Sequence, residues 1–164
     1  MAAPVGWDSP RRRYGFLALV AVAVFVLDQL TKALVMRSME VGDVIPLVPP
    51  VLDLHYITNR GVAFGLFARL GDVFVPIALL IMSAIFWYYR SLRSRRLWLR
   101  TALGLQLGGA LGNLLDRLRY GSVVDFVEFH IDPIGFRFAV FNVADSAIVV
   151  GVCILLATLL FRPD

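Results

Sequence analysis

The sequence predicts an all-α membrane protein, a bundle of four transmembrane helices with a small β-sheet outside the membrane. Apolar residues make up 59% of the 164 residues, charged residues only 17%, and the mean hydropathy is +0.77. Soluble domains average about 45–50% apolar and about 25% charged residues. The chain also contains four runs without charge, at 14–27, 73–89, 101–115 and 146–161, and two loops in which polar and apolar residues alternate.

Each charge-free run can become a membrane span when it takes in a polar residue at one end. A helix needs about 20 mostly apolar residues to cross the hydrocarbon core. We therefore expect spans at approximately 14–36, 72–90, 98–117 and 142–161, within a single domain that covers residues 1–164. Buried helices of a soluble bundle are the alternative, but four helices that are apolar on all sides belong in lipid.

The arginines predict the orientation of the spans. When the four spans alternate in direction, nine of the 16 basic residues lie on one side of the membrane, together with only two acidic residues, Asp8 and Asp164. The nine are Arg11, Arg12, Arg13, Arg90, Arg93, Arg95, Arg96, Arg100 and Arg162. The positive-inside rule then places both termini in the cytoplasm. Since topology explains the net charge of +4, we expect no nucleic-acid partner. No small-residue cleavage site follows the first run, so we expect an uncleaved first helix.

Aspartates mark the opposite membrane surface. With alternating spans, Asp28, Asp72, Asp116 and Asp145 all fall on that side. Carboxylates at a membrane surface or within it are costly and indicate a functional site. Asp72 follows Gly71 and is most simply explained as a solvated helix end. The other three lie in clusters with helical spacing, namely Asp28 with Lys32, Asn113 with Asp116 and Arg117, and Asn142 with Asp145. Gly108, Gly109 and Gly112 precede the second cluster and predict close helix packing.

The loops on the same side carry strand signals. Residues 51–57 alternate between apolar and polar types and end in the turn-forming sequence Asn59-Arg60-Gly61. Residues 123–131 also alternate and include Asp125, and a turn at 132–135 leads into a third extended segment at 136–141. We expect a small sheet at the outer membrane surface, because unpaired strand edges cannot lie in lipid.

Asp125 and Asp145 approach each other from the two ends of one loop. In a partly dry site two neighbouring carboxylates do not both ionise easily, so one keeps a proton while the other acts as a base. Such a pair can activate water for attack on an amide carbonyl and protonate the leaving amine. No Ser-His arrangement accompanies His55 or His130, and Cys153 lies in the fourth span as an apolar filler. We expect no metal and no cofactor.

Five motifs, in order, resemble those of the lipoprotein signal peptidases, also called signal peptidase II. They are Asp28-Gln29-Leu30-Thr31-Lys32, the segment 59–65 (NRGVAFG), the segment 108–117 (GGALGNLLDR), Val124-Asp125-Phe126 and the segment 141–146 (FNVADS). The resemblance implies four transmembrane helices with an extracytoplasmic β-cradle and a short surface helix, which we place near residues 63–70.

The resemblance also implies an activity. Members of this family are aspartyl endopeptidases of the bacterial inner membrane that remove the signal peptide from prolipoproteins, cutting before the diacylglyceryl-modified cysteine. Asp125 and Asp145 would form the catalytic pair. The residues that would shape the site or bind substrate are Asp28, Lys32, Asn59, Gly61, Asn113, Asp116, Arg117, Asn142 and Ala144. The expected partners are a lipidated prolipoprotein and membrane lipids, and the expected state is a monomer with its site near the extracytoplasmic surface.

Two other functions use the same aspartates. A small proton- or ion-coupled transporter would place them along a translocation path, but they gather at one surface and no inverted repeat is visible. A noncatalytic membrane scaffold would use the polar residues only to hold helices together. In that case single aspartate substitutions would lower stability and leave any chemistry unaffected.

Overall fold

The structure, a computed structural model, describes residues 10–61, 76, 80, 82–85, 87 and 97–161. Its elements in chain order are α1 (Pro10–Ser38), β1 (Val44–Val48), β2 (Leu52–Asn59), α3 (Leu97–Tyr120), β3 (Val123–Ile131), the 3-10 turn η3 (Asp132–Ile134), β4 (Phe136–Arg137) and α4 (Val143–Leu160). The described part of the chain is mostly helical and contains a small antiparallel sheet, as predicted. Most of the span expected at 72–90, including Asp72, and the surface helix expected near 63–70 lie outside the described residues.

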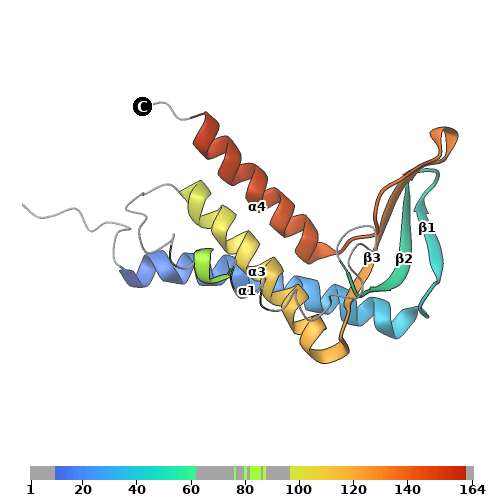
Figure 1. The fold of residues 1–164 in the computed structure, drawn as a ribbon, viewed down its shortest axis with the longest axis horizontal. Helices are drawn as coiled ribbons and strands as arrows, with labels where there is room; N and C mark the ends of the chain where they lie inside the picture. The colour runs from blue at the N-terminus through green and yellow to red at the C-terminus, as the bar shows by residue number, and fades with distance from the viewer. Residues whose placement is uncertain are drawn as a thin grey trace, which may run out of the picture.

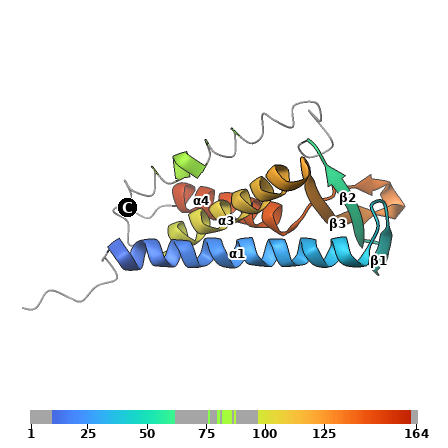
Figure 2. The same ribbon diagram turned by 90° about the horizontal axis from the view of Figure 1, so that it is seen from below.

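Helix α3 lies between α1 and α4 and packs closely on both (Figures 1 and 2). Glycines permit this approach, as the sequence predicts. A Cβ on Gly108 would lie 2.5 Å from the carbonyl oxygen of Ala21 in α1, and one on Gly109 would lie 2.5 Å from that of Ala144 in α4. Only residues without a side chain fit at these two crossings.

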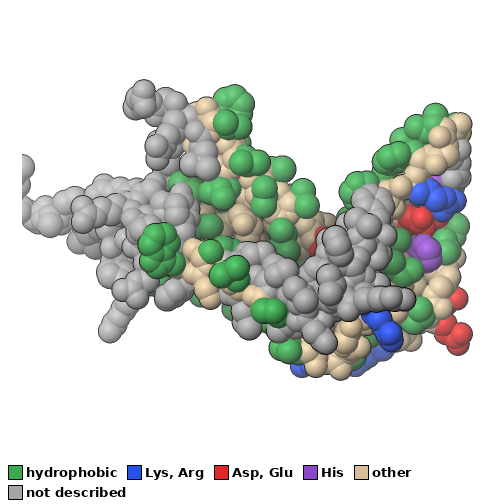
Figure 3. Space-filling model, viewed as in Figure 1, with side chains coloured by type: hydrophobic (Ala, Val, Ile, Leu, Met, Phe, Trp, Pro, Cys, Tyr) green, Lys and Arg blue, Asp and Glu red, His purple; other side chains and the backbone are tan. Residues whose placement is uncertain are grey.

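The described helices carry apolar surfaces of different length. Residues Tyr14–Ser38 of α1 are long and apolar enough to cross a membrane, whereas the apolar stretch Val143–Thr158 of α4 is shorter. Hydrophobic side chains cover much of the visible surface of α4 (Figure 3). Large exposed residues on these two helices include Leu19, Leu27 and Val149. Such surfaces fit contact with lipid better than contact with water.

The strands stand at one end of the bundle in the order β1-β2-β3-β4 (Figure 1). Both predicted strands at 51–57 and 123–131 form, and β3 has the predicted bounds. Strand β1 was not predicted. A register shift between Leu54 and Ile57 changes the pairing of β2 with β3, so that Ile57 pairs with Asp125 and Asn59 with Val123. The irregularity thereby brings Asn59 beside Asp125.

A hydrophobic cluster attaches the sheet to α1. Val35 in the last turn of the helix and Met39, directly after it, pack with Tyr56, Val124 and Phe126 of the strands. The same two strands also carry a polar contact, in which His55 Nδ1 lies 2.8 Å from Glu128 Oε2. Figure 3 shows charged and histidine side chains on the side of the sheet away from the helices.

Candidate active site

The first turn of α4 fixes the position of Asp145. Asn142 is the N-cap of the helix, and its side-chain oxygen accepts a hydrogen bond from the Asp145 backbone nitrogen at 2.9 Å. In return the Asn142 backbone nitrogen donates to Asp145 Oδ2 at 3.3 Å. This reciprocal arrangement is a capping box, and it explains the spacing of three residues in the sequence. The carboxylate therefore lies at the positive end of the α4 dipole.

Asp125 lies within β3 and is almost completely buried, with 1% of its surface exposed. Asn142 Nδ2 donates to its Oδ1 at 2.6 Å, and Asn59 Nδ2 donates to its Oδ2 at 2.9 Å. The Asn59 amide is itself oriented, because its oxygen accepts from the backbone nitrogen of Gly61 at 2.9 Å. The turn after β2 thus aims a donor at Asp125.

The pKa of Asp125 is strongly perturbed. Burial raises the pKa to about 7, and the negative charge of Asp145 adds to the rise. The hydrogen bonds from Asn59 and Asn142 act in the opposite direction because they favour the ionised form. A carboxyl group with this pKa can hold or release a proton near neutral pH.

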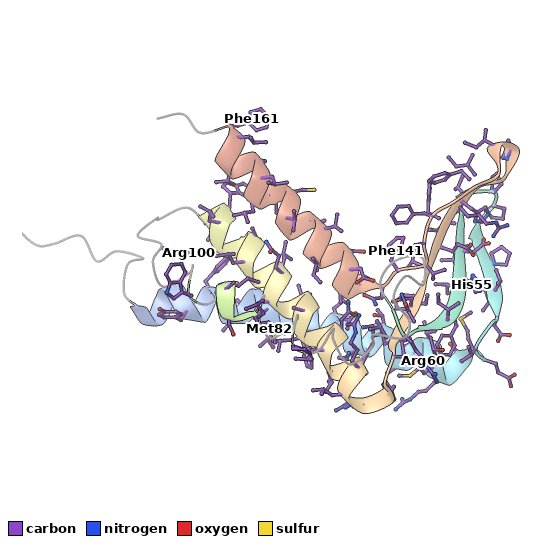
Figure 4. The ribbon with its side chains drawn as sticks, viewed as in Figure 1. His55, Arg60, Met82, Arg100, Phe141 and Phe161 are labelled. Carbon is purple, nitrogen blue, oxygen red and sulfur yellow. The ribbon has the colours of Figure 1, made fainter. Side chains whose placement is uncertain are left out.

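Both carboxylates line one open cavity of about 560 Å³. Its other lining residues are Asn59, Gly61, Asn113, Arg117, Val123, Phe138, Ala139, Val140, Phe141, Ser146, Ile148, Val149 and Val150. The polar groups gather around the carboxylates, and the β4–α4 connection and α4 supply most of the apolar walls. Figure 4 shows Phe141 at the point where this connection approaches the start of α4.

A buried ion cluster lies behind the two carboxylates. Lys32 Nζ is 2.9 Å from Asp28 Oδ2 and 2.8 Å from Asp116 Oδ2, and all three side chains are at most 1% exposed. The ammonium also donates to Asn113 Oδ1 at 2.9 Å. Asn113 Nδ2 in turn donates to Asp145 Oδ1 at 2.7 Å. The cluster is therefore connected to the cavity through Asn113.

Asp28 lies inside α1, ten residues before its last residue Ser38, and not at a solvated helix end. Its second oxygen, Oδ1, accepts from the backbone nitrogen of Ala144 at 3.0 Å, which satisfies a free donor in the first turn of α4. A Cβ on Gly112 would collide with Asp28 Oδ2, and Ala144 is fully buried nearby. The pairing of Asp28 with Lys32 expected from their spacing is confirmed.

The structure brings all the sequence-predicted site residues into this cavity or its supporting network. Arg117 lines the cavity and donates to the Asn113 backbone oxygen at 3.2 Å, whereas Asp116 supports Lys32 and also accepts from the Val124 nitrogen at 3.2 Å. Sequence reasoning missed Gln29, whose amide donates to Asp116 Oδ1 at 3.0 Å. Within the described residues, no group of three or more histidine, cysteine or acidic side chains is arranged to hold a metal ion.

Fold and site together define the class of this protein as a membrane enzyme. An apolar helical bundle carries, at one end, two amide-bound carboxylates beside a cavity with apolar walls. The comparisons with known proteins make the class more specific. The family model described as signal peptidase (SPase) II matches residues 20–161, and the chain belongs to this family of proteases.

Curated proteins named lipoprotein signal peptidase match nearly the whole chain. The one from Pelotomaculum thermopropionicum is 46% identical over 149 residues, covering 91% of this chain and 94% of that protein. The one from Syntrophotalea carbinolica is 42% identical over 148 residues, covering 88% and 90%. Two solved structures of bacterial membrane enzymes superpose with TM-scores of 0.82 and 0.80 at 34% and 32% identity. They cover 89% and 91% of this chain and 88% and 95% of their own.

Proposed function

We propose that this protein is an aspartic endopeptidase that removes the signal peptide from prolipoproteins, cleaving before the diacylglyceryl-modified cysteine. Family membership and the names of the relatives support the substrate class. One observation carries the chemistry, namely that Asp125 and Asp145 line the same cavity and are both bound by Asn142. No cofactor takes part in the proposed reaction.

The first step is the attack of water on the scissile carbonyl. We assign Asp145 as the base because its carboxylate lies at the N-terminus of α4, where it accepts from Asn113 Nδ2 and from the Asn142 backbone nitrogen. It takes a proton from the water as the oxygen bonds to the carbonyl carbon. Asp125, whose pKa is about 7, gives its proton to the carbonyl oxygen. The product of this step is a tetrahedral diol.

The second step breaks the carbon–nitrogen bond. The proton held by Asp145 passes to the leaving amine, and one hydroxyl of the diol returns its proton to Asp125. The new carboxyl group belongs to the signal peptide and the new amine belongs to the lipidated cysteine. Both aspartates regain their starting states, so the pair acts without a covalent intermediate.

The shape of the cavity suits a substrate that is partly lipid. Phe138 and Phe141 pack edge to face with ring centroids 5.9 Å apart, and Val149 and Val150 of α4 extend the same apolar wall. Apolar walls with a few convergent polar groups are typical of sites that bind small apolar ligands. The diacylglyceryl chains would contact these walls while the scissile bond reaches the carboxylates.

The proposed location is the bacterial inner membrane, with four spans, both termini in the cytoplasm and the site near the extracytoplasmic surface. Figure 4 shows Arg100 and Phe161 at the end of the bundle away from the sheet, with His55 and Arg60 at the sheet end. Arg100, which the positive-inside rule assigns to the cytoplasmic side, therefore lies at the end opposite the cavity, and this supports the proposed orientation. We propose a monomer, a single domain over residues 1–164, surrounded by membrane lipids.

Cleavage by the purified protein in detergent tests this function. We expect a lipidated prolipoprotein to be cut so that the lipidated cysteine becomes the new N-terminus, as read by mass spectrometry. The same precursor without the diacylglyceryl group should be processed poorly. Equal cutting of both precursors would argue for a general intramembrane protease, and the absence of any peptide product would favour the transporter.

A further inference from the structure

Lys32 is the only lysine of the chain, and Asn113 connects its ammonium to the carboxylate of Asp145. Its side chain is 1% exposed and its ammonium contacts Asp28, Asp116 and Asn113. A buried ion cluster of this kind gains little stability over an apolar replacement, because removing charges from water is costly. Stability is therefore a weak explanation for placing a cation here.

The contact with Asn113 has a directional consequence. An asparagine amide has an accepting end and a donating end of nearly equal shape, and its neighbours decide which way it points. An ammonium only donates, so Asn113 Oδ1 must face Lys32 at 2.9 Å. The opposite end, Nδ2, then donates to Asp145 Oδ1 at 2.7 Å. With the amide reversed, its NH₂ would face the ammonium and its oxygen would face a carboxylate.

The same oxygen also orients the second amide. Asn142 Nδ2 donates to Asn113 Oδ1 at 3.2 Å and to Asp125 Oδ1 at 2.6 Å. Both hydrogen bonds require the donating end of Asn142 to face the interior. The orientation of the Asn113 amide therefore places a donor at Asp145. It also favours the orientation of Asn142 in which Nδ2 donates to Asp125.

We propose that Lys32 is a positioning residue of the reaction, which acts through Asn113 and Asn142 to direct one amide donor at each catalytic aspartate. The inference rests on the proposed catalytic pair and explains how the donors to the two carboxylates are oriented. Asp28 and Asp116 serve this arrangement by holding the ammonium in place. Asp28 also accepts from Ala144 in the first turn of α4, so the same cluster positions the helix that carries Asp145.

Lys32 has an electrostatic effect that must be separated from positioning. The charged groups near Asp125 are Asp145 on α4, Lys32 and Asp28 on α1, and Asp116 and Arg117 on α3. Burial and the charge of Asp145 are the larger effects, and both raise the pKa of Asp125. The positive charge of Lys32 lowers this pKa. Removing only this charge would raise the pKa of Asp125 and leave the amides in place.

Two variants separate the effects. Lys32→Met removes the donor and the charge together, and Lys32→Met with Asp116→Asn removes the donor while restoring the net charge of the cluster. For Lys32→Met we expect kcat to fall about 10²–10³-fold, the usual consequence of losing an oriented donor. KM should stay within about threefold because substrate contacts are unchanged. The basic limb of the pH–rate profile should move to higher pH.

The double variant decides between positioning and charge. We expect its basic limb to return toward that of the unmodified protein while kcat stays about 10²-fold low. Arg119→Met, which removes an exposed cation from the last turn of α3, is the matched control and should keep full activity. Recovery of kcat in the double variant, or unchanged kcat in folded Lys32→Met, would overturn the inference. Activity of Asp125→Asn or Asp145→Asn would instead overturn the proposed catalytic pair.

If Lys32→Met does not accumulate as folded protein, the double variant alone carries the test. It lacks one buried carboxylate as well as the cation, and Asp28 keeps donors from Ala144 at 3.0 Å and Gln29 at 3.2 Å. Folding is measured by monodispersity and thermal unfolding in detergent. A folded double variant with low kcat supports positioning, and one with full kcat refutes it.

Discussion

Replacing Asn59 by alanine should change the pH dependence of cleavage more distinctively than its rate. The substitution removes the Nδ2 donor that lies 2.9 Å from Asp125 Oδ2. A hydrogen bond to a charged group contributes about 1.5–3 kcal/mol, and about 1.4 kcal/mol corresponds to one pKa unit. Loss of this bond disfavours the ionised form, so the pKa of Asp125 should rise from about 7 by roughly one to two units.

The direction of the expected change follows from the role of Asp125 as the acid. Cleavage is lost when this group gives up its proton, so kcat/KM of the unmodified protein should fall above about pH 7. In Asn59→Ala the fall should begin at higher pH, although the maximum is lower because the carboxyl group is less well oriented. The assay is kcat/KM for a lipidated precursor between pH 5 and about 10 in detergent.

The neighbouring exposed residue provides a control. Arg60→Ala changes the same turn but removes no group that lines the cavity, so its profile should coincide with that of the unmodified protein. A basic limb of Asn59→Ala that stays in place or moves to lower pH, in a folded protein, would refute the assignment of Asp125 as the acid.

Three further outcomes follow from the same geometry. Because the pKa of Asp125 is raised in the folded state, its ionisation costs stability as pH rises from about 4 to 7. Asp125→Asn cannot ionise, so its free energy of unfolding relative to that of the unmodified protein should rise by on the order of 4 kcal/mol between pH 4 and pH 8. Thermal unfolding should show Gly112→Ala destabilised by about 1–3 kcal/mol, because its Cβ would collide with the carboxylate of Asp28 in the ion cluster. A Cβ on Gly15 would have no heavy atom within 4 Å, so Gly15→Ala should not be destabilised. Phe138→Ala should raise KM for the lipidated precursor about tenfold, because apolar contact with the lipid is lost. Phe136 lies outside the cavity, so Phe136→Ala should leave KM unchanged. Equal KM values for the two variants would place the lipid elsewhere.

Much of the site could be predicted because its residues follow local periodicities. The spacing of four between Asp28 and Lys32, and of three between Asn142 and Asp145, corresponds to one helical face and to a capping box, and both contacts form. Strand β3 was predictable from its alternation. These features depend on neighbours in the chain, so the sequence alone contains the information.

Other features depend on contacts between distant segments. Strand β1 was missed because Pro46 interrupts it and all its residues are exposed, which removes the usual alternation. Gln29 was missed because no helical spacing of three or four connects it to another residue of the predicted clusters. Its partner Asp116 comes from α3, 87 residues later. The role of Asn113 as the link between the ion cluster and Asp145 likewise depends on how α1, α3 and α4 pack.

The central claim is that Asp125 and Asp145 together carry out the hydrolysis, and single-turnover cleavage tests it most directly. With a lipidated precursor at pH 6, Asp125→Asn and Asp145→Asn should each lower the rate by on the order of 10³-fold or more while remaining folded. Asp43→Asn, which changes an exposed carboxyl group of the loop before β1, should cleave at the unmodified rate. A normal rate in either of the first two variants would contradict the catalytic pair.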